Sequence, residues 1–431
     1  MNESLESSDV LCVYGIQSSE FYSLIERWLS QREARFVVLV FDHPDEIQAF
    51  FASEKGRGFL ERSAIRPLIL QDEEALKQIA WEFVFLHFSY LFSALDEDKA
   101  RSVQAKIEQV REAVHLVASD YRDLGSQVLK NVLRNAPRFQ NASFAKRLEG
   151  CFSGIPAIIC GAGPSLDSSL ACLKELRLRN RALIFAGGAS LNALSKESLL
   201  PHFSAGLDPS SSKSRFLDQD FFETPFFYQS RLSSEVLDLA HGPLLWVSDS
   251  GGYPIEKWIH ERLGVESAFF EGGWNVATLN AALSVALGCN PIIFVGMDLC
   301  SQGQALYAAN VQDVAAADAL FLVENRRKEK VRARRDWIMA ADWIRHFTQA
   351  HPQHSFFSTA LNGLDLGEIT YCPLSEIAEE QLKEAFDLEG MVHRAIQTAG
   401  RGGISEEIIA DILREVETSR MCSLELCREI L

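Results

Sequence analysis

The stretch that decides the fold is Ile158-Ile159-Cys160-Gly161-Ala162-Gly163-Pro164-Ser165-Leu166-Asp167. A short apolar run, typical of a buried strand, leads into two glycines separated by one residue, and a sequence that can start a helix follows. Such a turn can hold a phosphate, because it offers backbone N–H groups next to the positive end of a helix dipole. Leu166 stands where the dinucleotide fingerprint needs its third glycine, and no Gly-Lys-Ser/Thr of a P-loop follows. The sequence therefore predicts a nucleotide or phosphate site of a less common kind.

Four residues of this turn are the expected phosphate-binding group: Gly161, Gly163, Pro164 and Ser165. The alternative is a tight strand-to-helix turn in which Pro164 occupies the first helical turn. Asp167 follows directly, and a bare carboxylate would repel a phosphate. We therefore expect Asp167 to bind a ribose hydroxyl or a bridging cation, or to serve as a helix N-cap.

Short apolar runs alternate with helical patterns on both sides of this turn in the central part of the chain. Strands are predicted at 156–160, 182–185, 203–207, 226–229, 244–247, 292–297 and 355–358. The alternation favours an α/β fold with a central, mainly parallel, Rossmann-like sheet and helices on both faces. Ligands of such sheets bind outside the carboxyl ends of the strands.

Three further candidates lie at predicted strand ends, namely Gly187, Asp208 and Asp298. The two aspartates suit ribose, sugar hydroxyls or magnesium. Capping of its own turn explains Asp208 equally well, because Pro209 follows it.

A second glycine turn, Gly272-Gly273, precedes an alanine-rich helix and can form another anion-binding nest. Asn275 and Thr278 at the start of that helix are then placed to contact a base or a sugar. A basic run at 326–335 either neutralises an anionic donor or acceptor or forms a solvated helix face.

The N-terminal segment is a smaller β-α-β unit. Its first turn has the single glycine Gly15, and Asp42 ends its second strand, where nucleotide-binding folds place a ribose ligand. Nucleotide binding and a structural remnant are both open for this unit. We predict four parts: a Rossmann-like α/β domain at 1–92, a helical connector at 93–140, the central domain at 141–372 and a C-terminal helical segment at 373–431.

Composition restricts the classes of function. The 431 residues carry a formal charge of −17, which argues against a general binder of nucleic acid or of anionic membranes. The nine cysteines have no C-x-x-C spacing, so we expect a reduced, cytoplasmic protein without structural zinc. Neither a signal peptide nor an apolar run long enough for a membrane span is evident. The oligomeric state is not indicated.

The motif Ile158 to Asp167, the turn Gly206 to Pro209, the segment Glu271 to Asn275 and the strand end Pro291 to Leu299 together resemble the motility accessory factor (Maf) and MptE-like family. In that family G-x-G-P-S-L-D opens the central domain and a G-x-D-L strand end closes the pocket. The resemblance covers roughly residues 140 to 370 and implies an MptE-like or Maf-like central domain with a sialyltransferase-like core.

The resemblance implies two chemistries. Maf proteins move nonulosonic acids from CMP donors to Ser or Thr hydroxyls, whereas the MptE branch transfers diphosphate from ATP to a 6-hydroxymethylpterin with magnesium. Gly161, Gly163, Pro164 and Ser165 would then hold the nucleotide phosphate. The nucleotide or sugar pocket would be lined by Asp208, Gly273, Asn275 and Asp298.

We expect a glycosyltransferase-like enzyme with a nucleotide-activated sugar donor and a protein or glycan acceptor. The diphosphokinase is the first alternative, and magnesium would then bind through Asp167, Asp208 or Asp298. A nucleotide-binding protein without turnover is the second. No catalytic base is selected by the sequence.

Overall fold

The computed structural model describes residues 7–15, 19–60, 62–92, 97–211, 220–248, 253–265, 272–309, 311, 320–401 and 403–430. The chain divides into two compact units, Met1–Asp123 and Leu124–Leu431.

The first unit is built on a four-stranded parallel sheet with strand order β3-β2-β1-β4. Alternate residues of β1 enter two different apolar clusters, so both faces of this sheet are covered. The elements are β1 (Val10–Tyr14), α2 (Ser19–Ser30), β2 (Phe36–Phe41), α3 (Pro44–Ala52), α4 (Glu54–Leu60), β3 (Ile65–Ile69), α5 (Glu73–Glu82), β4 (Phe88–Phe92) and the first part of α6 (Glu97–Asn135).

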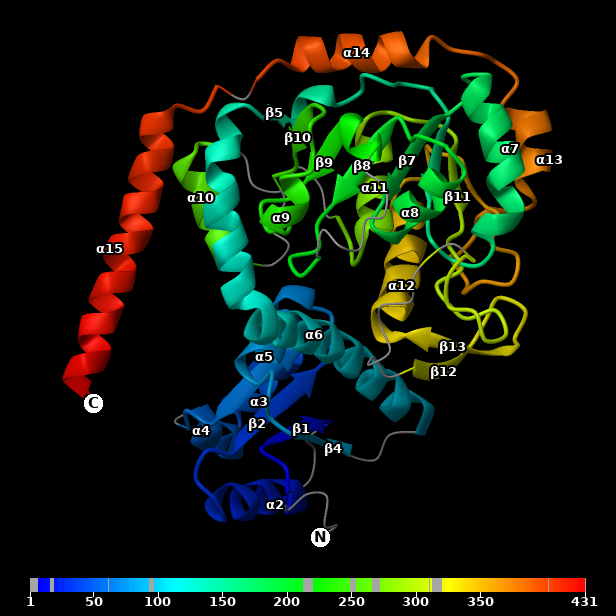
Figure 1. Cartoon of the computed structure of the whole chain (residues 1–431). Coiled ribbons are helices and arrows are strands. Elements are labelled where there is room, and N and C mark those ends of the chain that lie inside the picture. The colour runs from blue at the N-terminus through cyan, green and yellow to red at the C-terminus, as the bar shows by residue number, and fades with distance from the viewer. Residues whose placement is uncertain are drawn as a thin grey trace. The chain divides into compact units, whose positions relative to one another are not determined.

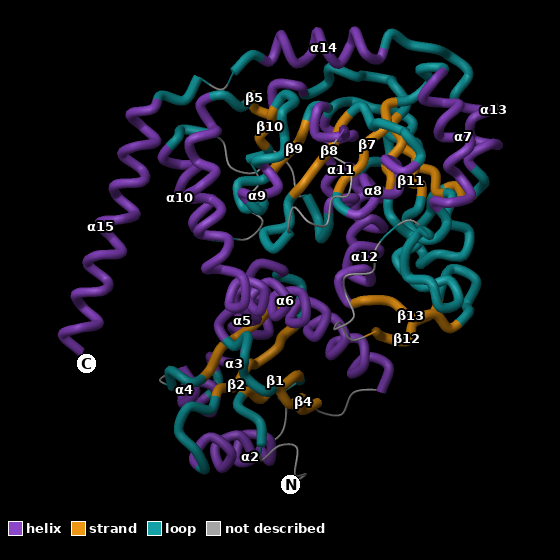
Figure 2. The backbone as a smooth tube through the Cα atoms, viewed as in Figure 1, coloured by secondary structure: helices purple, strands orange, loops and turns teal. Residues whose placement is uncertain are grey.

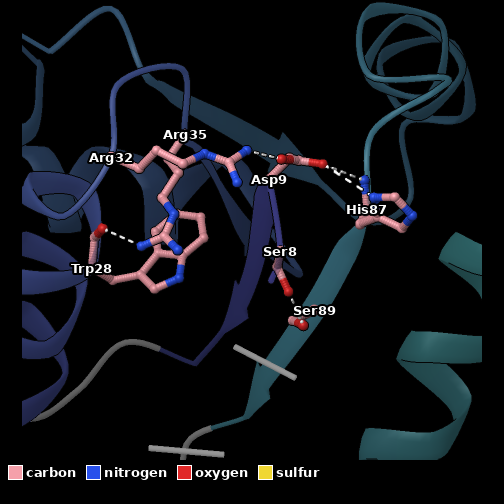
Figure 3. A network of polar contacts seen from close by, with 7 residues as sticks. All are labelled: Ser8, Asp9, Trp28, Arg32, Arg35, His87 and Ser89. Atoms are coloured by element: carbon pink, nitrogen blue, oxygen red, sulfur yellow. Dashed lines mark hydrogen bonds and ion pairs between the residues drawn. The ribbon is translucent and has the colours of Figure 1, made fainter. Parts of the chain in front are cut away.

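Polar contacts fix the amino end of β1 (Figure 3). The Asp9 carboxylate accepts hydrogen bonds from the Arg32 guanidinium and from the backbone N–H of His87, the latter at 3.0 Å. These bonds, the His87 amide first, hold the pKa of Asp9 below its usual range. The buried Arg35 lies over the Trp28 ring and donates to the Trp28 carbonyl at 2.8 Å. This network is structural, because it lies at the end of the sheet opposite to the one where α/β folds bind ligands.

The second unit contains a nine-stranded sheet and a separate hairpin. The elements after α6 are η1 (Ala136–Gln140), β5 (Ser143–Phe144), η2 (Ala145–Leu148), β6 (Ala157–Cys160), α7 (Leu166–Leu178), β7 (Leu183–Gly187), α8 (Ala189–Lys196), β8 (Phe203–Gly206), η4 (Asp220–Glu223), β9 (Phe226–Tyr228), α9 (Ser234–Leu237), β10 (Leu244–Trp246), α10 (Pro254–Arg262), α11 (Val276–Ala286), β11 (Ile292–Val295), β12 (Leu320–Glu324), β13 (Lys330–Arg334), α12 (Arg335–Ala350), β14 (Phe356–Ser358), β15 (Thr370–Tyr371), α13 (Leu374–Gln381), α14 (Leu388–Ala399) and α15 (Glu406–Ile430).

The strand order of the large sheet is β15-β14-β11-β6-β7-β8-β9-β10-β5, and every neighbouring pair is parallel. Ile158 and Cys160 point into one apolar cluster with α7, α13 and α15, whereas Ala157 and Ile159 point into another with α11, α12 and α14. In Figure 2 the labelled strands β10, β9, β8, β7 and β11 follow one another across the sheet, with helices around them. The predicted parallel sheet with helices on both faces, the smaller preceding sheet and the helical tail are therefore confirmed.

Two local predictions are wrong. The basic run is not a helix face, because residues 326–334 form the turn and second strand of the antiparallel hairpin β12–β13. The second concerns the tail, where the sequence predicts two amphipathic helices at roughly 376–399 and 405–430. The described residues there form three helices, because residues 382–387 separate α13 from α14. Figure 1 shows the last of them, α15, extending to the C-terminus.

Candidate functional site

The sequence order of the strands reverses between β6 and β11. From β6 the chain moves outward through β7 to β10, whereas β11 lies on the other side of β6. In open parallel sheets, ligands bind outside the carboxyl ends of the strands at such a switch point. The glycine motif follows β6 and Asp298 follows β11, whose last residue, Val295, pairs with Cys160. These two predicted segments therefore flank the switch point.

Both glycines of the motif lie against the backbone after β11. The N–H of Gly161 donates to the Val295 carbonyl at 2.7 Å, and that of Gly163 donates to the Gly296 carbonyl at 2.8 Å. A Cβ on Gly161 would lie 2.3 Å from the Gly296 oxygen, and one on Gly163 would lie 2.2 Å from Oδ2 of Asp298. Close approach of two chain segments therefore requires both glycines. Their N–H groups are already engaged within the protein.

Asp298 joins the loops around the switch point. Its fully buried carboxylate accepts hydrogen bonds at Oδ2 from the N–H (3.0 Å) and the hydroxyl (2.8 Å) of Ser165, and at Oδ1 from Nε2 of Gln302 (2.6 Å). Burial raises the pKa of Asp298, and the bonds from Ser165 and Gln302 oppose that rise. We call Asp298, Ser165 and Gln302 the switch-point clamp. Its carboxylate receives the Ser165 donors that sequence analysis assigned to a phosphate.

Asp167 also ties two segments together. Ser165, not Asp167, is the N-cap residue of α7. Oδ2 of Asp167 accepts from the N–H of Ala309 at 2.9 Å, and the N–H of Ala308 donates to the Ala162 carbonyl at 2.9 Å. The half-buried Ala162 has an N–H group with no partner in the described part of the chain. This amide and the N-terminus of α7 are the donors that the motif leaves for a ligand.

Gly187 is the last residue of β7, and Asp208 comes two residues after the end of β8. A Cβ on Gly187 would lie 2.3 Å from Cγ2 of Val276, so its lack of a side chain lets α11 pack against β7. Asp208 accepts from the N–H of Ser210 at 2.9 Å and from the hydroxyl of Ser211 at 2.8 Å. This is the turn-capping geometry that the sequence left as an alternative. The serine-rich turn continues into 212–219, outside the described residues.

The second glycine turn starts α11. Oδ1 of Asn275 accepts from the N–H groups of Ala277 and Thr278, both at 3.0 Å, and the Thr278 hydroxyl accepts from the N–H of Asn275 at 3.0 Å. The same hydroxyl donates to the Gly272 carbonyl at 3.0 Å. Gly273 has φ +70°, and a Cβ there would lie 2.6 Å from Oγ1 of Thr278. Asn275 and Thr278 therefore form a capping box, and Gly272 and Gly273 lie against Thr278.

Direct contacts thus connect most of the predicted residues in two groups. Gly161, Gly163, Ser165 and Asp298 lie together at the switch point, and Gly272 to Thr278 lie together at the start of α11, where Val276 also contacts Gly187. Gln302 was missed by sequence analysis. The sequence feature that could have indicated Gln302 is its polar side chain, four positions after Asp298.

A groove beside the hairpin was also missed. It has a volume of about 580 Å³ and lies between the loop that follows Asp298 and the strands β12 and β13. The signal for the hairpin is the alternation Lys330-Val331-Arg332-Ala333-Arg334, which is typical of a half-exposed strand.

The three aspartates proposed for magnesium do not form a ready-made cation site. Within the described ranges, no group of three or more His, Cys, Asp or Glu side chains is close enough to hold a metal ion. Both carboxylate oxygens of Asp298 and of Asp208 already accept hydrogen bonds. A magnesium ion here would depend on the phosphate oxygens of a bound nucleotide for its ligands.

The acid of the N-terminal unit is likewise engaged. Asp42 accepts from the Tyr14 hydroxyl and from Nζ of Lys99, the latter at 2.9 Å, and Lys99 lies over the Tyr14 ring. Partial burial alone would raise the pKa of Asp42, but the hydrogen bonds from Tyr14 and Lys99 outweigh it and hold the pKa low. The glycine turn beside it continues into 16–18, outside the described residues.

Residues 130–304 match the family model described as 6-hydroxymethylpterin diphosphokinase MptE-like. The chain carries an MptE-like segment. It covers less than half of the chain and includes the glycine motif, the second glycine turn and the whole switch-point clamp. The resemblance predicted from these motifs is therefore confirmed over this range.

The structure of the Maf glycosyltransferase from Magnetospirillum magneticum AMB-1 is similar, with a TM-score of 0.65 and 15% sequence identity. The similarity covers 94% of this chain and 63% of that one, so the present chain spans less than two thirds of the Maf enzyme's length. At 15% identity, this similarity shows that the two proteins share a fold. No curated protein matches the chain. Among the described helices, none combines the length and apolarity that crossing a membrane requires.

Proposed function

We propose that this protein is a glycosyltransferase-like enzyme that transfers a sugar of the nonulosonic or sialic acid type from a nucleotide donor, such as a CMP-sugar, to a protein or glycan hydroxyl. One observation carries the proposal. The glycine motif and Asp298 flank the switch point of a parallel sheet whose fold is shared with a Maf glycosyltransferase.

The donor phosphate binds at the N-terminus of α7 in this proposal. The free N–H of Ala162 and the positive end of the helix dipole supply the attraction, and Pro164 and Ser165 border the same turn. Asp298 is a positioning residue here, because its carboxylate fixes the orientation of Ser165. Its negative charge would repel a phosphate in direct contact, so we place the phosphate on the Ala162 side of the motif.

Transfer of a sugar makes three demands: the phosphate must be fixed, charge developing on the leaving nucleotide must be offset, and the acceptor hydroxyl must lose its proton. The helix N-terminus meets the first two. Asp208 and the amide group of Asn275, at the end of β8 and the start of α11, are our candidates for contacts to the sugar or the ribose.

Diphosphate transfer from ATP to a 6-hydroxymethylpterin is the second candidate, and the family match over residues 130–304 favours it. The same helix N-terminus would then hold ATP phosphates, with magnesium bound mainly through the nucleotide. A nucleotide-binding protein without turnover would show binding to the same site and neither reaction.

A ligand screen by thermal unfolding separates these functions. A nucleotide present at about 100 times its Kd stabilises the fold by about 2.7 kcal/mol, which raises the Tm by roughly 5 °C. A shift with CMP but not with ATP supports the glycosyltransferase. Magnesium-dependent AMP release from ATP with a pterin acceptor supports the diphosphokinase. No shift with CMP, UDP, ADP or ATP, with or without magnesium, would overturn the nucleotide site itself.

Asp208→Asn tests the pocket without disturbing the clamp. Asparagine keeps an oxygen for the Ser210 N–H, so the turn should persist while the charge is lost. We expect at least fivefold weaker nucleotide binding, and no change for Asp411→Asn on the exposed side of α15. Equal affinities of the two variants would remove Asp208 from the site. Gly163→Val is unsuitable, because its side chain would collide with Asp298 whether or not a ligand binds there.

A further inference from the structure

The groove beside the hairpin, which we call the hairpin groove, combines basic and apolar side chains. Its walls are Ser301, Gly303, Gln304 and Leu306 from the loop after β11, and Leu320, Leu322, Lys330, Val331 and Arg332 from β12 and β13. Leu322 pairs with Arg332 across the two strands, and Glu324 pairs with Lys330, so these side chains share one face of the hairpin.

The chemistry of this face favours an anionic ligand. Of the seven basic residues between 326 and 335, Lys330 and Arg332 line the groove. Lys330 is paired with Glu324 at 3.1 Å, whereas the exposed guanidinium of Arg332 has no hydrogen bond or ion pair within the described residues. Arg332 is therefore available for a carboxylate.

The same face also favours apolar contacts. Leu320 is 40% exposed and Leu322 is 67% exposed. A free phosphate or carboxylate would engage Arg332 and leave both leucines in water. Among the described residues that line the groove none is aromatic, so these residues offer no platform for stacking nucleic-acid bases. A peptide with acidic and aliphatic side chains satisfies both kinds of contact.

The hairpin groove is linked to the switch point by hydrogen bonds. Ser301 donates its N–H to the Arg332 carbonyl at 2.7 Å, and the Ser301 hydroxyl accepts from the Arg332 N–H at 3.1 Å. The next residue, Gln302, belongs to the switch-point clamp. A single short loop thus forms one wall of the groove and supports the proposed donor site.

We propose that the hairpin groove binds an acidic peptide segment of the acceptor protein, with aliphatic side chains on Leu320 and Leu322 and a carboxylate on Arg332. The role of this peptide as an acceptor rests on the proposed function, the transfer of a sugar to a protein hydroxyl. Binding of the peptide itself does not require a bound nucleotide-sugar donor.

Fluorescence anisotropy on the full chain without nucleotide tests the proposal. The probe is a fluorescein-labelled ten-residue peptide that alternates aspartate, leucine and serine, and a second peptide has lysine in place of aspartate. We expect only the acidic peptide to bind, with affinity that falls as salt rises. Arg332→Glu should weaken binding about tenfold. Arg327→Glu makes the same change of net charge in the same hairpin but lies outside the groove lining, so it should change affinity less than twofold.

A third variant tests the apolar contacts separately from the charge. Leu322→Ser removes the most exposed leucine of the groove and should weaken binding of the acidic peptide while leaving the Tm unchanged. Equal binding of both peptides, or equal losses in Arg332→Glu and Arg327→Glu, would overturn the proposal. The thermal shift with CMP, measured on the same variants, reports on the donor site separately, so failure of one proposal does not hide the other.

Discussion

Ser165→Ala tests the switch-point clamp. The variant deletes a hydroxyl that donates at 2.8 Å to a fully buried carboxylate. A hydrogen bond to a charged group contributes about 1.5–3 kcal/mol. The N–H of residue 165 and the amide of Gln302 still reach Asp298, so we expect a loss of about 2 kcal/mol in the free energy of unfolding.

The loss should depend on pH. Burial already raises the pKa of Asp298, and removal of one donor to its ionised form raises that pKa further. Above the folded pKa the variant lacks a bond to a charge, whereas below it the carboxyl is neutral in both proteins. The difference between wild type and variant should therefore shrink as the pH falls through the folded pKa of Asp298.

Urea unfolding followed by tryptophan fluorescence measures this difference, because five of the seven tryptophans lie in the second unit. Ser168→Ala is the matched control. It removes an exposed hydroxyl, three positions further along, that donates to a neutral carbonyl at 2.8 Å. We expect it to change stability by less than about 0.5 kcal/mol. Equal losses in the two variants, or a loss in Ser165→Ala that is the same at every pH, would refute the clamp.

Two further predictions concern the core of the second unit. Burial lowers the pKa of His260, whose ring packs against Trp246, to about 4. The unfolded chain takes up this proton near pH 6.5, so stability should fall as the pH decreases from about 6.5 towards 4, and His260→Phe should flatten that part of a urea-unfolding profile. Gly187→Ala should cost about 1–3 kcal/mol, because its Cβ would collide with Val276. Val276→Ala should recover part of that loss in a double-mutant cycle, and purely additive effects would contradict the packing explanation.

Much of the fold follows from local signals. Apolar runs such as Ile158–Cys160 and Ile292–Val295 are short and bounded by glycine or proline, and helical patterns separate them. These features are enough to predict a parallel sheet and which residues lie at its carboxyl ends. They do not fix the order of strands, because an apolar strand buried on both faces can pair with any other.

The role of the glycine motif depends on a partner that local sequence does not identify. Gly161 and Gly163 favour a phosphate nest when considered alone. In the structure, Gly296 and Asp298 approach them so closely that a Cβ does not fit, and they accept the hydrogen bonds from Gly163 and Ser165. The sequence predicts correctly that both segments lie at strand ends. It cannot show that the two segments contact each other and form hydrogen bonds with each other.

The hairpin was missed for a different reason. In the run 326–335 the charges dominate, and only Val331 and Ala333 show the period of two that identifies a strand. Ala333 is fully buried, so a residue with little apolar surface fixes which face of β13 points inward.

The central position of β11 has a consequence for synthesis of the chain. Ala157 pairs with Ile292, about 135 residues later. At roughly 5–20 residues per second, the ribosome needs roughly 7–27 s to make the intervening chain. During that interval one edge of β6, an apolar strand, has no neighbour, and the proposed donor site has only one of its two walls. Chaperone binding to the nascent chain would therefore matter most before residue 295 emerges.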